Sequence, residues 1–476
     1  MPETKQYLVA GEWRSGQDTF EVTSPYNGEV VARVGKPSEG DVERAVQAAH
    51  DIFPECRRLP VHARAEALMH ISSRLGERLD EVAGIITREN GKPIKWAKFE
   101  AARAVSTFRW AAEECRHEQG SIMRLDAEAS LGSRAGLIRR FPRGPVLAIA
   151  PFNFPVNLMA HKMAPALAVG APVVMKPATQ TPLGTLLLAE LFAETDLPPE
   201  MCSALPIGGS ESDALVRDDR FAKISFTGST EVGWGIKEKA PRKAVTMELG
   251  GNAGVIVHSD ADLDKAAQRV AFGGYYQAGQ SCISVQRVLV HADVAGEFND
   301  KLVVEVEKLQ NGDPMDPETD VGPLIDPAAL DRISAWVDEA VQLGAEVLTG
   351  AKREDPFYLP TVLARTTPEM KVVQEEIFGP VITVATYTSF EDALAEVNNT
   401  PFGLQAGIFT SDVKRLFLAH RELEVGGVIG NDVSAFRADQ MPYGGVKDSG
   451  MGREGLRSAM DEMTDVKILV LSDVPL

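Results

Sequence analysis

The sequence predicts an α/β fold in which parallel strands are covered by helices. From Pro145 onward, short apolar segments alternate with longer segments of helical pattern. This alternation is typical of a parallel sheet that binds ligands at the carboxyl ends of its strands. Strands are expected at 146–150, 173–175, 202–206 and 222–226, with helices that end at Gly170 and Glu194 and a third over 231–239. A chain of 476 residues is long enough for two or three domains.

A second strand-and-helix series runs from about residue 248 to residue 431 and predicts a second α/β domain. It is entered through a strand at 244–247, a glycine turn and a strand at 254–258. A helix over about 263–276 follows and ends at the glycine-containing residues 277–280, as a helix C-terminus often does. The next strand is expected at 285–291.

The N-terminal part begins with β structure and continues with helices. Residues 7–35 alternate and turn like a small β unit, with a tight turn at 24–28. Ser38 and Asp41 form a plausible capping pair before a helix whose apolar residues recur at i, i+3, i+4 spacing, namely Val42, Ala45, Val46, Ala49 and Phe53. Two further helices are expected over about 61–79 and 94–117.

Residues 118–143 break this pattern and predict a two-stranded ribbon. Strands around Met123 and Ile138 flank a polar connection. Such a ribbon cannot bury its own faces, and the apolar C-terminal segment 466–471 could pair with it. The unpaired strand edges and apolar surface predict a homodimer or a homotetramer built as a dimer of dimers.

Composition and charge limit the partners. A net charge of −19 opposes binding to a phosphate backbone, so no nucleic acid is expected. No run approaches a membrane span and the N-terminus lacks the apolar core of a signal peptide, so we expect a cytoplasmic protein with no membrane partner. No structural metal or disulfide is expected, because four cysteines lie far apart at Cys56, Cys115, Cys202 and Cys282.

Cys282 lies on the turn between the helix over 263–276 and the strand over 285–291, where a thiol can face a cleft. Most free cysteines are inert packing groups. A thiol becomes a good nucleophile only as the thiolate, which needs a nearby base or a field of amide donors. Glu248, on the glycine turn before the strand at 254–258, is a candidate base.

Six motifs favour a catalytic role for Cys282 over a packing role. They are PFNFP at 151–155, FTGST at 226–230, ELGG at 248–251, GQSC at 279–282, EIFGP at 376–380 and PYGGVKDSG at 442–450. Together and in this order, over about residues 11–467, they resemble the aldehyde dehydrogenase superfamily. The resemblance implies a Rossmann-like NAD(P)-binding domain (1–120 and 143–247), an α/β catalytic domain (248–445), and a small β oligomerisation ribbon and tail (121–142 and 460–476).

The resemblance also implies a function, the oxidation of an aldehyde to the carboxylic acid with NAD(P)+. A thiolate adds to the carbonyl, donors stabilise the oxyanion, hydride leaves to a nicotinamide, and water cleaves a thioester. By resemblance, Cys282 is the nucleophile, and the Asn153 amide and the Cys282 backbone N–H are the oxyanion donors. Glu248 resembles the general base that activates the water.

Simpler alternatives exist for two of these residues and for the function. Asn153 could cap the helix that begins near Asn157, and Glu248 could be a turn carboxylate in solvent. Relatives that release an acyl-coenzyme A typically lack the glutamate. A coenzyme A-acylating semialdehyde dehydrogenase and a catalytically idle structural or binding homologue are the alternatives to hydrolytic oxidation, although this chain keeps Cys282, Asn153 and Glu248.

The cofactor residues are carried over by resemblance. Lys176 resembles the lysine that binds the adenosine ribose, Gly228 and Ser229 lie where pyrophosphate meets a helix start, and Glu376 and Phe378 would hold the nicotinamide ribose and ring. The segment 228–233 lacks the full glycine fingerprint and by itself could be a mere turn. Thr179 stands where strongly NAD-selective relatives often carry a glutamate, which would repel a 2′-phosphate, so the expected cofactor is NAD or NADP.

The substrate is expected to be a small aldehyde in a mostly apolar channel. By resemblance the channel is lined by Phe152, Leu158, His161, Ser281, Ile283, Phe436 and Tyr443. The segments 153–158 and 431–439 resemble the lactaldehyde and non-phosphorylating glyceraldehyde-3-phosphate dehydrogenase branches. Ser281 argues against the latter, which carries a cationic residue directly before the nucleophile. Arg437 could compensate for it, or could pair with Asp439 in solvent.

Overall fold

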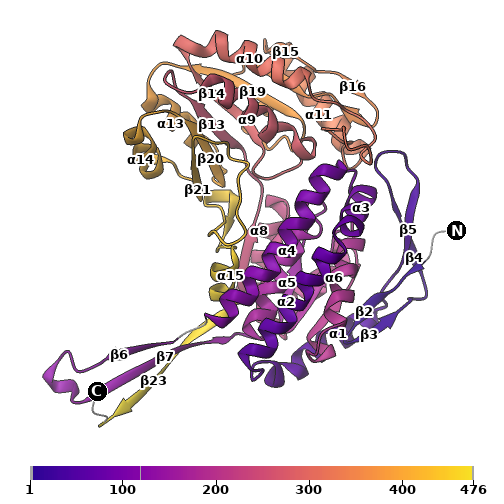
Figure 1. Cartoon of the computed structure of the whole chain (residues 1–476), viewed down its shortest axis with the longest axis vertical. Helices are drawn as coiled ribbons and strands as arrows, with labels where there is room; N and C mark the ends of the chain where they lie inside the picture. The colour runs from indigo at the N-terminus through magenta and orange to yellow at the C-terminus, as the bar shows by residue number, and fades with distance from the viewer. Residues whose placement is uncertain (1–3, 118–119, 474–476) are drawn as a thin grey trace.

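Two α/β lobes and a projecting arm make up the structure, a computed structural model that describes residues 4–117 and 120–473 (Figure 1). The first lobe has an eight-stranded sheet in the order β22-β12-β11-β8-β9-β10-β2-β3. Its five central strands are parallel, as the alternating pattern predicts, whereas β22, β2 and β3 are antiparallel to their neighbours. The strands are β2 (Tyr7–Val9), β3 (Glu12–Arg14), β8 (Val146–Ile149), β9 (Val173–Lys176), β10 (Cys202–Ala204), β11 (Lys223–Thr227), β12 (Ala244–Glu248) and β22 (Gly450–Met451).

The second lobe has a seven-stranded sheet in the order β15-β18-β19-β14-β13-β20-β21. All its pairs are parallel except β15 with β18. The strands are β13 (Ala253–Val257), β14 (Val285–His291), β15 (Glu346–Thr349), β18 (Thr361–Ala364), β19 (Val381–Tyr387), β20 (Gln405–Phe409) and β21 (Gly427–Gly430), with a separate hairpin of β16 (Arg353–Glu354) and β17 (Phe357–Tyr358). The predicted α/β fold class is therefore confirmed.

Helices cover the first sheet and enclose the largest apolar core of the molecule. They are α1 (Glu39–Cys56), α2 (Val61–Glu77), α3 (Leu79–Asn90), α4 (Ile94–Arg116), α5 (Asn157–Val169), α6 (Leu183–Ala193), α7 (Gly209–Arg217), α8 (Thr230–Lys239) and α15 (Leu456–Glu462). The capping pair of Ser38 and Asp41 is confirmed, because each side chain bonds the backbone of the other. No element was expected at α3 or α7. Gly84 and the β-branched residues of α3 weaken its local helix signal, and packing against α4 stabilises it.

The helices of the second lobe complete two smaller apolar cores on their sheet. They are α9 (Leu263–Tyr275), α10 (Ala295–Glu307), α11 (Pro327–Gln342), α12 (Lys371–Gln374), α13 (Phe390–Asn398) and α14 (Val413–Glu422). A small N-terminal sheet of β1 (Thr4–Lys5), β5 (Val30–Gly35) and β4 (Thr19–Thr23) lies beside the first lobe. None of the described helices is both long and apolar enough to cross a membrane.

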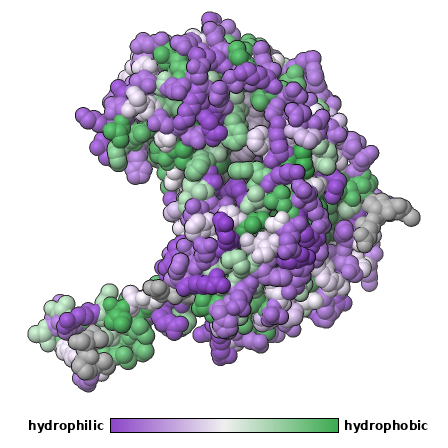
Figure 2. Space-filling model, in the orientation of Figure 1, coloured by the Kyte–Doolittle hydropathy of each residue, from purple (hydrophilic) through white to green (hydrophobic). Residues whose placement is uncertain are grey.

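The arm is an antiparallel sheet of β6 (Ser121–Arg124), β7 (Arg134–Pro142) and β23 (Thr464–Ser472). The C-terminal tail pairs with the ribbon along the whole of β7, as predicted; residues 118–119 and 474–476 of the predicted ribbon and tail lie outside the described residues. Figure 2 shows apolar residues gathered on the arm and a hollow between the arm and the second lobe. Large exposed apolar side chains of the arm include Ile122, Met123, Val466, Ile468 and Leu469.

Candidate active site

Cys282 lies on an irregular turn between α9 and β14, at the junction of the lobes. After α9 the backbone enters the left-handed region at Gln277, Ala278 and Gly279, with φ of 57°, 53° and 70°. A side chain at Gly279 would collide with the carbonyl of Gly379, so only glycine fits there. The turn ends the helix and presents the thiol beside the glycine turn that follows β12. A side chain at Gly251 in that turn would collide with the Cys282 carbonyl.

The Cys282 thiol is partly buried and has one hydrogen-bond partner. Its Sγ lies 3.2 Å from the hydroxyl of Tyr443. Burial raises the pKa of the thiol to about 12, although the Tyr443 hydroxyl lowers it. The resting group is therefore a neutral thiol, and attack on a carbonyl requires a group that takes its proton.

Glu248 is the last residue of β12 and is buried, so the alternative of a solvent-exposed turn carboxylate is wrong. Among the described residues neither of its carboxyl oxygens has a hydrogen-bond partner. Burial and then the negative charge of Glu454 raise the pKa of Glu248 well above its ordinary value, against the opposing charge of Arg437. A buried carboxyl of this kind can both hold and accept a proton near neutral pH.

Asn153 lies in the loop between β8 and α5 and is buried. Its side-chain Nδ2 donates a hydrogen bond of 2.9 Å to the carbonyl of Gln280, two residues before Cys282. The alternative role as a helix cap is wrong, because the first amides of α5, those of Val156 and Asn157, donate to Glu100 Oε1 at 3.0 and 3.1 Å. The structure thus brings the amide of Asn153 to the turn that carries Cys282.

The residues predicted to bind the adenosine end surround the carboxyl ends of β9 and β11. Lys176 ends β9, and burial lowers the pKa of its ammonium group while the nearby Glu211 raises it. Ser229 is the N-cap residue of α8, yet its hydroxyl bonds no amide of that helix, so these donors are available to an anion. Thr179 is exposed in the loop after β9. Sequence reasoning did not include Glu211, which lies on the unpredicted helix α7.

Glu376 and Phe378, predicted to hold the nicotinamide end, lie against the nucleophile turn. Glu376 Oε1 accepts a hydrogen bond of 2.9 Å from the Gly251 amide, and burial raises the pKa of the carboxyl to about 7. The Phe378 ring contacts Phe152 edge-on, with centroids 6.0 Å apart. The chemistry of these groups, a helix start with unpaired amides, a lysine and a carboxylate, fits the pyrophosphate and two riboses of a dinucleotide.

Three of the predicted substrate residues adjoin the thiol: Ser281 and Ile283 flank Cys282 in the chain, and Tyr443 contacts its Sγ. Ile283 and Tyr443 form an apolar cluster against which Cys282 packs. Phe152 contacts Phe378, Leu158 is buried on α5, and the Ser281 hydroxyl is 2.8 Å from that of Tyr276. His161 is fully enclosed and its Nε2 lies 3.1 Å from Asp439. Phe436 is 45% exposed and is the least enclosed of the set.

The side chain of Arg437 is buried, so the alternative of a solvated pair with Asp439 is wrong. Its Nη2 lies 3.0 Å from Glu454 Oε2, and its guanidinium lies 3.8 Å over the centre of the Tyr443 ring. Among the described residues its Nε has no hydrogen-bond partner. Asp439 instead pairs with Arg103 at 2.8 Å and with His161. Two arginines and a histidine therefore converge behind the tyrosine that contacts the thiol.

Sequence reasoning missed Lys162 and Glu454, which join this cluster. Lys162 Nζ lies 2.7 Å from both Glu454 Oε1 and Thr227 Oγ1 inside the first lobe. Burial raises the pKa of Glu454, but the charges of Lys162 and Arg437 lower it, and it lies at about 2. One signal was available in the sequence, because Lys162 is the only charged residue within α5, a helix that is otherwise almost wholly apolar.

The buried cluster carries an excess of positive charge at neutral pH. Burial lowers the pKa of His161 to about 4, so the imidazole is neutral, and burial raises the pKa of Glu248 well above its ordinary value. The ion pairs of the cluster join three cationic side chains to two anionic ones; they are Arg103, Lys162 and Arg437 against Asp439 and Glu454. An anion near this cluster would be electrostatically favoured.

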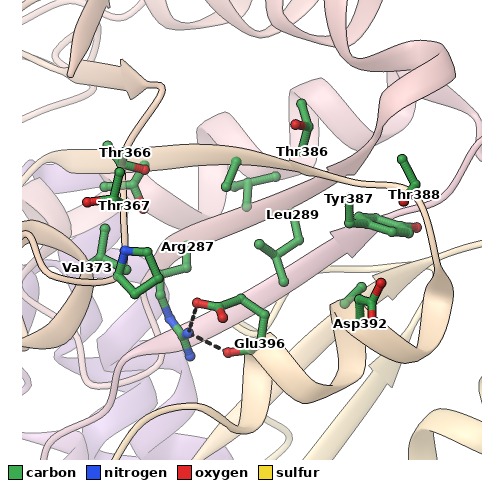
Figure 3. Close-up of a pocket in the computed structure, with 15 residues that line it drawn as sticks. Arg287, Leu289, Thr366, Thr367, Val373, Thr386, Tyr387, Thr388, Asp392 and Glu396 are labelled. Carbon is green, nitrogen blue, oxygen red and sulfur yellow. Dashed lines mark hydrogen bonds and ion pairs between the residues drawn. The ribbon is translucent and has the colours of Figure 1, made fainter. Parts of the chain in front are cut away.

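A pocket on the second lobe, of about 450 Å³, lies apart from this site (Figure 3). It opens between β14, β19 and α13. The guanidinium of Arg287 points toward Glu396 and donates to the backbone carbonyls of Asn252, Glu396 and Val397. Its donors are thus used within the fold, where they stabilise the backbone of this lobe.

A cysteine nucleophile site at the junction of two α/β lobes defines the class of protein, and comparison with known proteins gives the family. The model of the aldehyde dehydrogenase family matches residues 13–469, so the chain belongs to this family. The predicted resemblance is therefore confirmed.

Relatives of stated activity match over almost the whole chain. It is 41% identical to the 3-sulfolactaldehyde dehydrogenase of Priestia aryabhattai, over 99% of both chains. It is 36% identical to the lactaldehyde dehydrogenase of Methanocaldococcus jannaschii, over 98% of this chain and 100% of the other. These relatives agree with the lactaldehyde dehydrogenase branch, one of the two branches predicted from the sequence.

Solved structures are equally similar. Aldehyde dehydrogenase 21 of Physcomitrella patens, in complex with the reaction product succinate, superimposes with a TM-score of 0.98 and 42% identity over 100% of this chain and 99% of that one. The glyceraldehyde-3-phosphate dehydrogenase GapN of Methanocaldococcus jannaschii, complexed with NADP, gives a TM-score of 0.92 and 36% identity over 96% and 100%. The protein is thus an enzyme that oxidises an aldehyde to the carboxylic acid with NAD(P)+, through a thioester that water hydrolyses.

Proposed function

We propose that Cys282, Asn153 and Glu248 carry out this reaction on an aldehyde that bears an anionic group. The observation that carries the proposal is their convergence: the Asn153 amide reaches the turn of Cys282, and Glu248 ends β12 directly before the adjoining glycine turn, with a carboxyl that has no hydrogen-bond partner among the described residues. The reaction begins when the thiol proton passes to solvent water and the thiolate Sγ bonds to the carbonyl carbon. The carbonyl oxygen then takes the negative charge and is stabilised by the Asn153 amide and the Cys282 N–H.

The second half of the reaction depends on Glu248. A bound nicotinamide, held by Glu376 and Phe378, would supply the hydride acceptor, so that the carbon bonded to Cys282 Sγ would become a thioester. Deprotonated Glu248 takes a proton from water, the hydroxide adds to the thioester, and the carbon–sulfur bond breaks to release the acid. The thiolate regains a proton, and the enzyme is restored. The glutamate thus supports hydrolysis over transfer to coenzyme A.

We further propose that Lys176, Thr179, Gly228 and Ser229 hold the adenosine and pyrophosphate, and that Glu376 and Phe378 hold the nicotinamide riboside. Thr179 offers a neutral hydroxyl where a carboxylate would repel a 2′-phosphate, and Lys176 can pair with that phosphate. The nearby Glu211 is occupied, since it accepts from the Gly208 amide at 2.7 Å and pairs with Lys36. NADP should therefore serve at least as well as NAD.

Wild-type turnover tests this assignment directly. With a panel of aldehydes, the enzyme should reduce NADP and NAD at comparable efficiency and release the free acid whether or not coenzyme A is added. Thr179→Glu should lower kcat/KM for NADP by about one to three decades and change that for NAD modestly, because it restores repulsion of the 2′-phosphate. Steady-state absorbance of the reduced nicotinamide measures both. Strict use of NAD by the wild type, or an acyl-coenzyme A product, would contradict the proposal.

The anionic group of the substrate is inferred from the positive cluster and from the relatives. Arg437 lies over Tyr443, whose hydroxyl contacts the Cys282 thiol, and its Nε has no partner among the described residues. The substrates and products for which several relatives are named carry a sulfonate or carboxylate: 3-sulfolactaldehyde, aspartate semialdehyde, sulfoacetaldehyde and succinate. A sulfonate or carboxylate would offset the excess charge and satisfy the free donor.

Arg437→Met should therefore lower kcat/KM for the four-carbon aldehyde acid that yields succinate by about 10- to 100-fold. Butanal, which has the same length and no charge, is the matched substrate and should change within about threefold. Arg437→Lys keeps the charge, so its kcat/KM for the aldehyde acid should lie between those of the wild type and Arg437→Met. The ratio of the two substrates is the readout, because any general damage to the site cancels in it. An equal loss with both aldehydes would show that Arg437 does not recognise the anion.

The assembly and domain limits predicted from the sequence complete the proposal. We propose that a second copy covers the exposed apolar residues of the arm, in a homodimer or homotetramer. We propose that the first lobe, which also includes β22 and α15, is the NAD(P)-binding domain predicted at 1–120 and 143–247, and that the second is the catalytic domain predicted at 248–445. A cytoplasmic location is in keeping with four cysteines that are all free thiols.

A further inference from the structure

Asn90, the last residue of α3, links the two segments that form the proposed oxyanion site. It is fully buried. Its Nδ2 donates a hydrogen bond of 2.6 Å to the carbonyl of Phe152, and its Oδ1 accepts one of 2.6 Å from Gln277 Nε2. Phe152 directly precedes Asn153, and Gln277 lies on the left-handed turn before Cys282. One side chain therefore bridges the loop of the first lobe and the turn of the second.

The position of Asn90 is fixed by the end of its helix. Gly91 ends α3 in the left-handed region with φ of 76°. A Cβ there would lie 2.6 Å from Pro323 and 2.8 Å from Pro25, so the chain packs closely on both sides of this glycine. The carbonyl of Pro323 accepts a hydrogen bond from Gln280 Nε2. The segment that packs against Gly91 therefore also contacts the turn that carries Cys282. Asn90 consequently has little room to move relative to either segment.

Lys92, two residues after Asn90, holds the next residue of the same loop, Asn153. Its buried Nζ donates a hydrogen bond of 2.8 Å to the carbonyl of Asn153, pairs with Glu100 and lies 3.8 Å over the centre of the Phe154 ring. The carbonyls of two consecutive residues, Phe152 and Asn153, are thus held from behind. With its backbone fixed in this way, Asn153 has its side chain directed at the Gln280 carbonyl.

A closed circuit of hydrogen bonds results. Asn90 contacts Phe152 and Gln277, the Gln277 carbonyl accepts from the Gln280 amide at 3.1 Å, and the Gln280 carbonyl accepts from Asn153. We propose that Asn90 is a positioning residue, which holds the Asn153 amide and the Cys282 N–H at the spacing that the oxyanion requires. This inference rests on the proposed roles of Cys282 and Asn153. Preorganised donors lose their effect when they shift by about 1 Å, and one donor contributes about 10²- to 10³-fold in rate.

The test measures hydride transfer in a double-mutant cycle of Asn90→Ala with Asn153→Ala. Asn90→Ala alone should slow the first-turnover rate about 10- to 100-fold. In the Asn153→Ala background it should cost less than about threefold, because the group that Asn90 positions is already absent. Asn90→Asp keeps the acceptor for Gln277 and removes the donor to Phe152 with almost no change in size. It should reproduce most of the loss in a protein that remains folded.

Two readouts distinguish positioning from general damage. Alkylation of Cys282 by iodoacetamide forms no oxyanion, so its rate should stay within about threefold in both Asn90 variants, and the NADP dissociation constant should stay within about twofold. Asn398→Ala is the matched control, since the Asn398 side chain also ends a helix, donates to one carbonyl, that of Glu422, and accepts from another group, the Glu424 amide, away from the thiol. It should leave hydride transfer unchanged.

Three outcomes decide the inference. Multiplicative effects of the two substitutions, or alkylation and NADP binding that fall in parallel with oxidation, would overturn the role of Asn90 while leaving that of Asn153 intact. If Asn153→Ala alone left hydride transfer unchanged, the proposed oxyanion site itself would be wrong. The cycle therefore separates failure of the inference from failure of the function on which it rests.

Discussion

Replacing Cys282 with alanine should abolish aldehyde oxidation while NADP binding stays near that of the wild type. No other described residue offers a thiol at the lobe junction, because Cys56, Cys115 and Cys202 are buried elsewhere in the first lobe. Covalent catalysis cannot proceed without the sulfur, so the expected loss in kcat is about 10⁴-fold or more. Steady-state oxidation measures the loss, and isothermal titration calorimetry with NADP measures cofactor binding.

A matched control is available in Cys202→Ala. Burial raises the pKa of the Cys202 thiol strongly, so it is inert, and removing it should leave oxidation within about threefold of the wild type. Residual turnover of Cys282→Ala within about tenfold of the wild type would remove Cys282 from the mechanism.

Replacing Glu248 with glutamine should allow one turnover and then stop the enzyme. The amide has the size of the carboxyl and cannot take a proton from water. A burst of reduced nicotinamide is therefore expected, followed by a steady-state rate about 10²- to 10⁴-fold below that of the wild type. Stopped-flow fluorescence resolves the two phases. A variant that turns over at the wild-type steady-state rate would show that Glu248 does not activate the water.

The pH profile provides a second readout for Glu248. Its pKa is raised above the ordinary value by burial and by Glu454, and only the deprotonated carboxylate can accept a proton. The wild-type kcat should therefore rise with pH through a limb that lies above the usual carboxyl range, and Glu248→Gln should lack this limb. A limb that persists unchanged in the variant would have to arise from another group.

The sequence allowed the fold to be predicted where a pattern repeats locally. Alternating apolar strands and helices predicted both sheets, and the glycines of the 277–280 segment predicted the turn that presents Cys282. Helix α3 was missed because its own residues favour a helix weakly, and it forms against α4. With it the end residue Asn90 was missed, and so was its contact with the active-site loop.

The charges of the site could not be predicted for a different reason. Arg437 and Asp439 are two residues apart and resemble a surface pair in the sequence. In the structure Arg437 turns to Glu454 and Asp439 to Arg103, a residue on α4 that is distant in the chain. Burial and pairing of this kind depend on how helices and loops meet in three dimensions, which no local pattern encodes.

The most direct test of the central claim is the mass of the trapped intermediate. Glu248→Gln, mixed with NADP and the four-carbon aldehyde acid and quenched in acid during the burst, should gain the mass of one acyl group. Peptide mapping should place that group on the Cys282 thiol, and the adduct should be absent without NADP or in the Cys282→Ala, Glu248→Gln double variant. An unmodified Cys282 after a full burst of reduced nicotinamide, or an acyl group on another residue, would contradict the account.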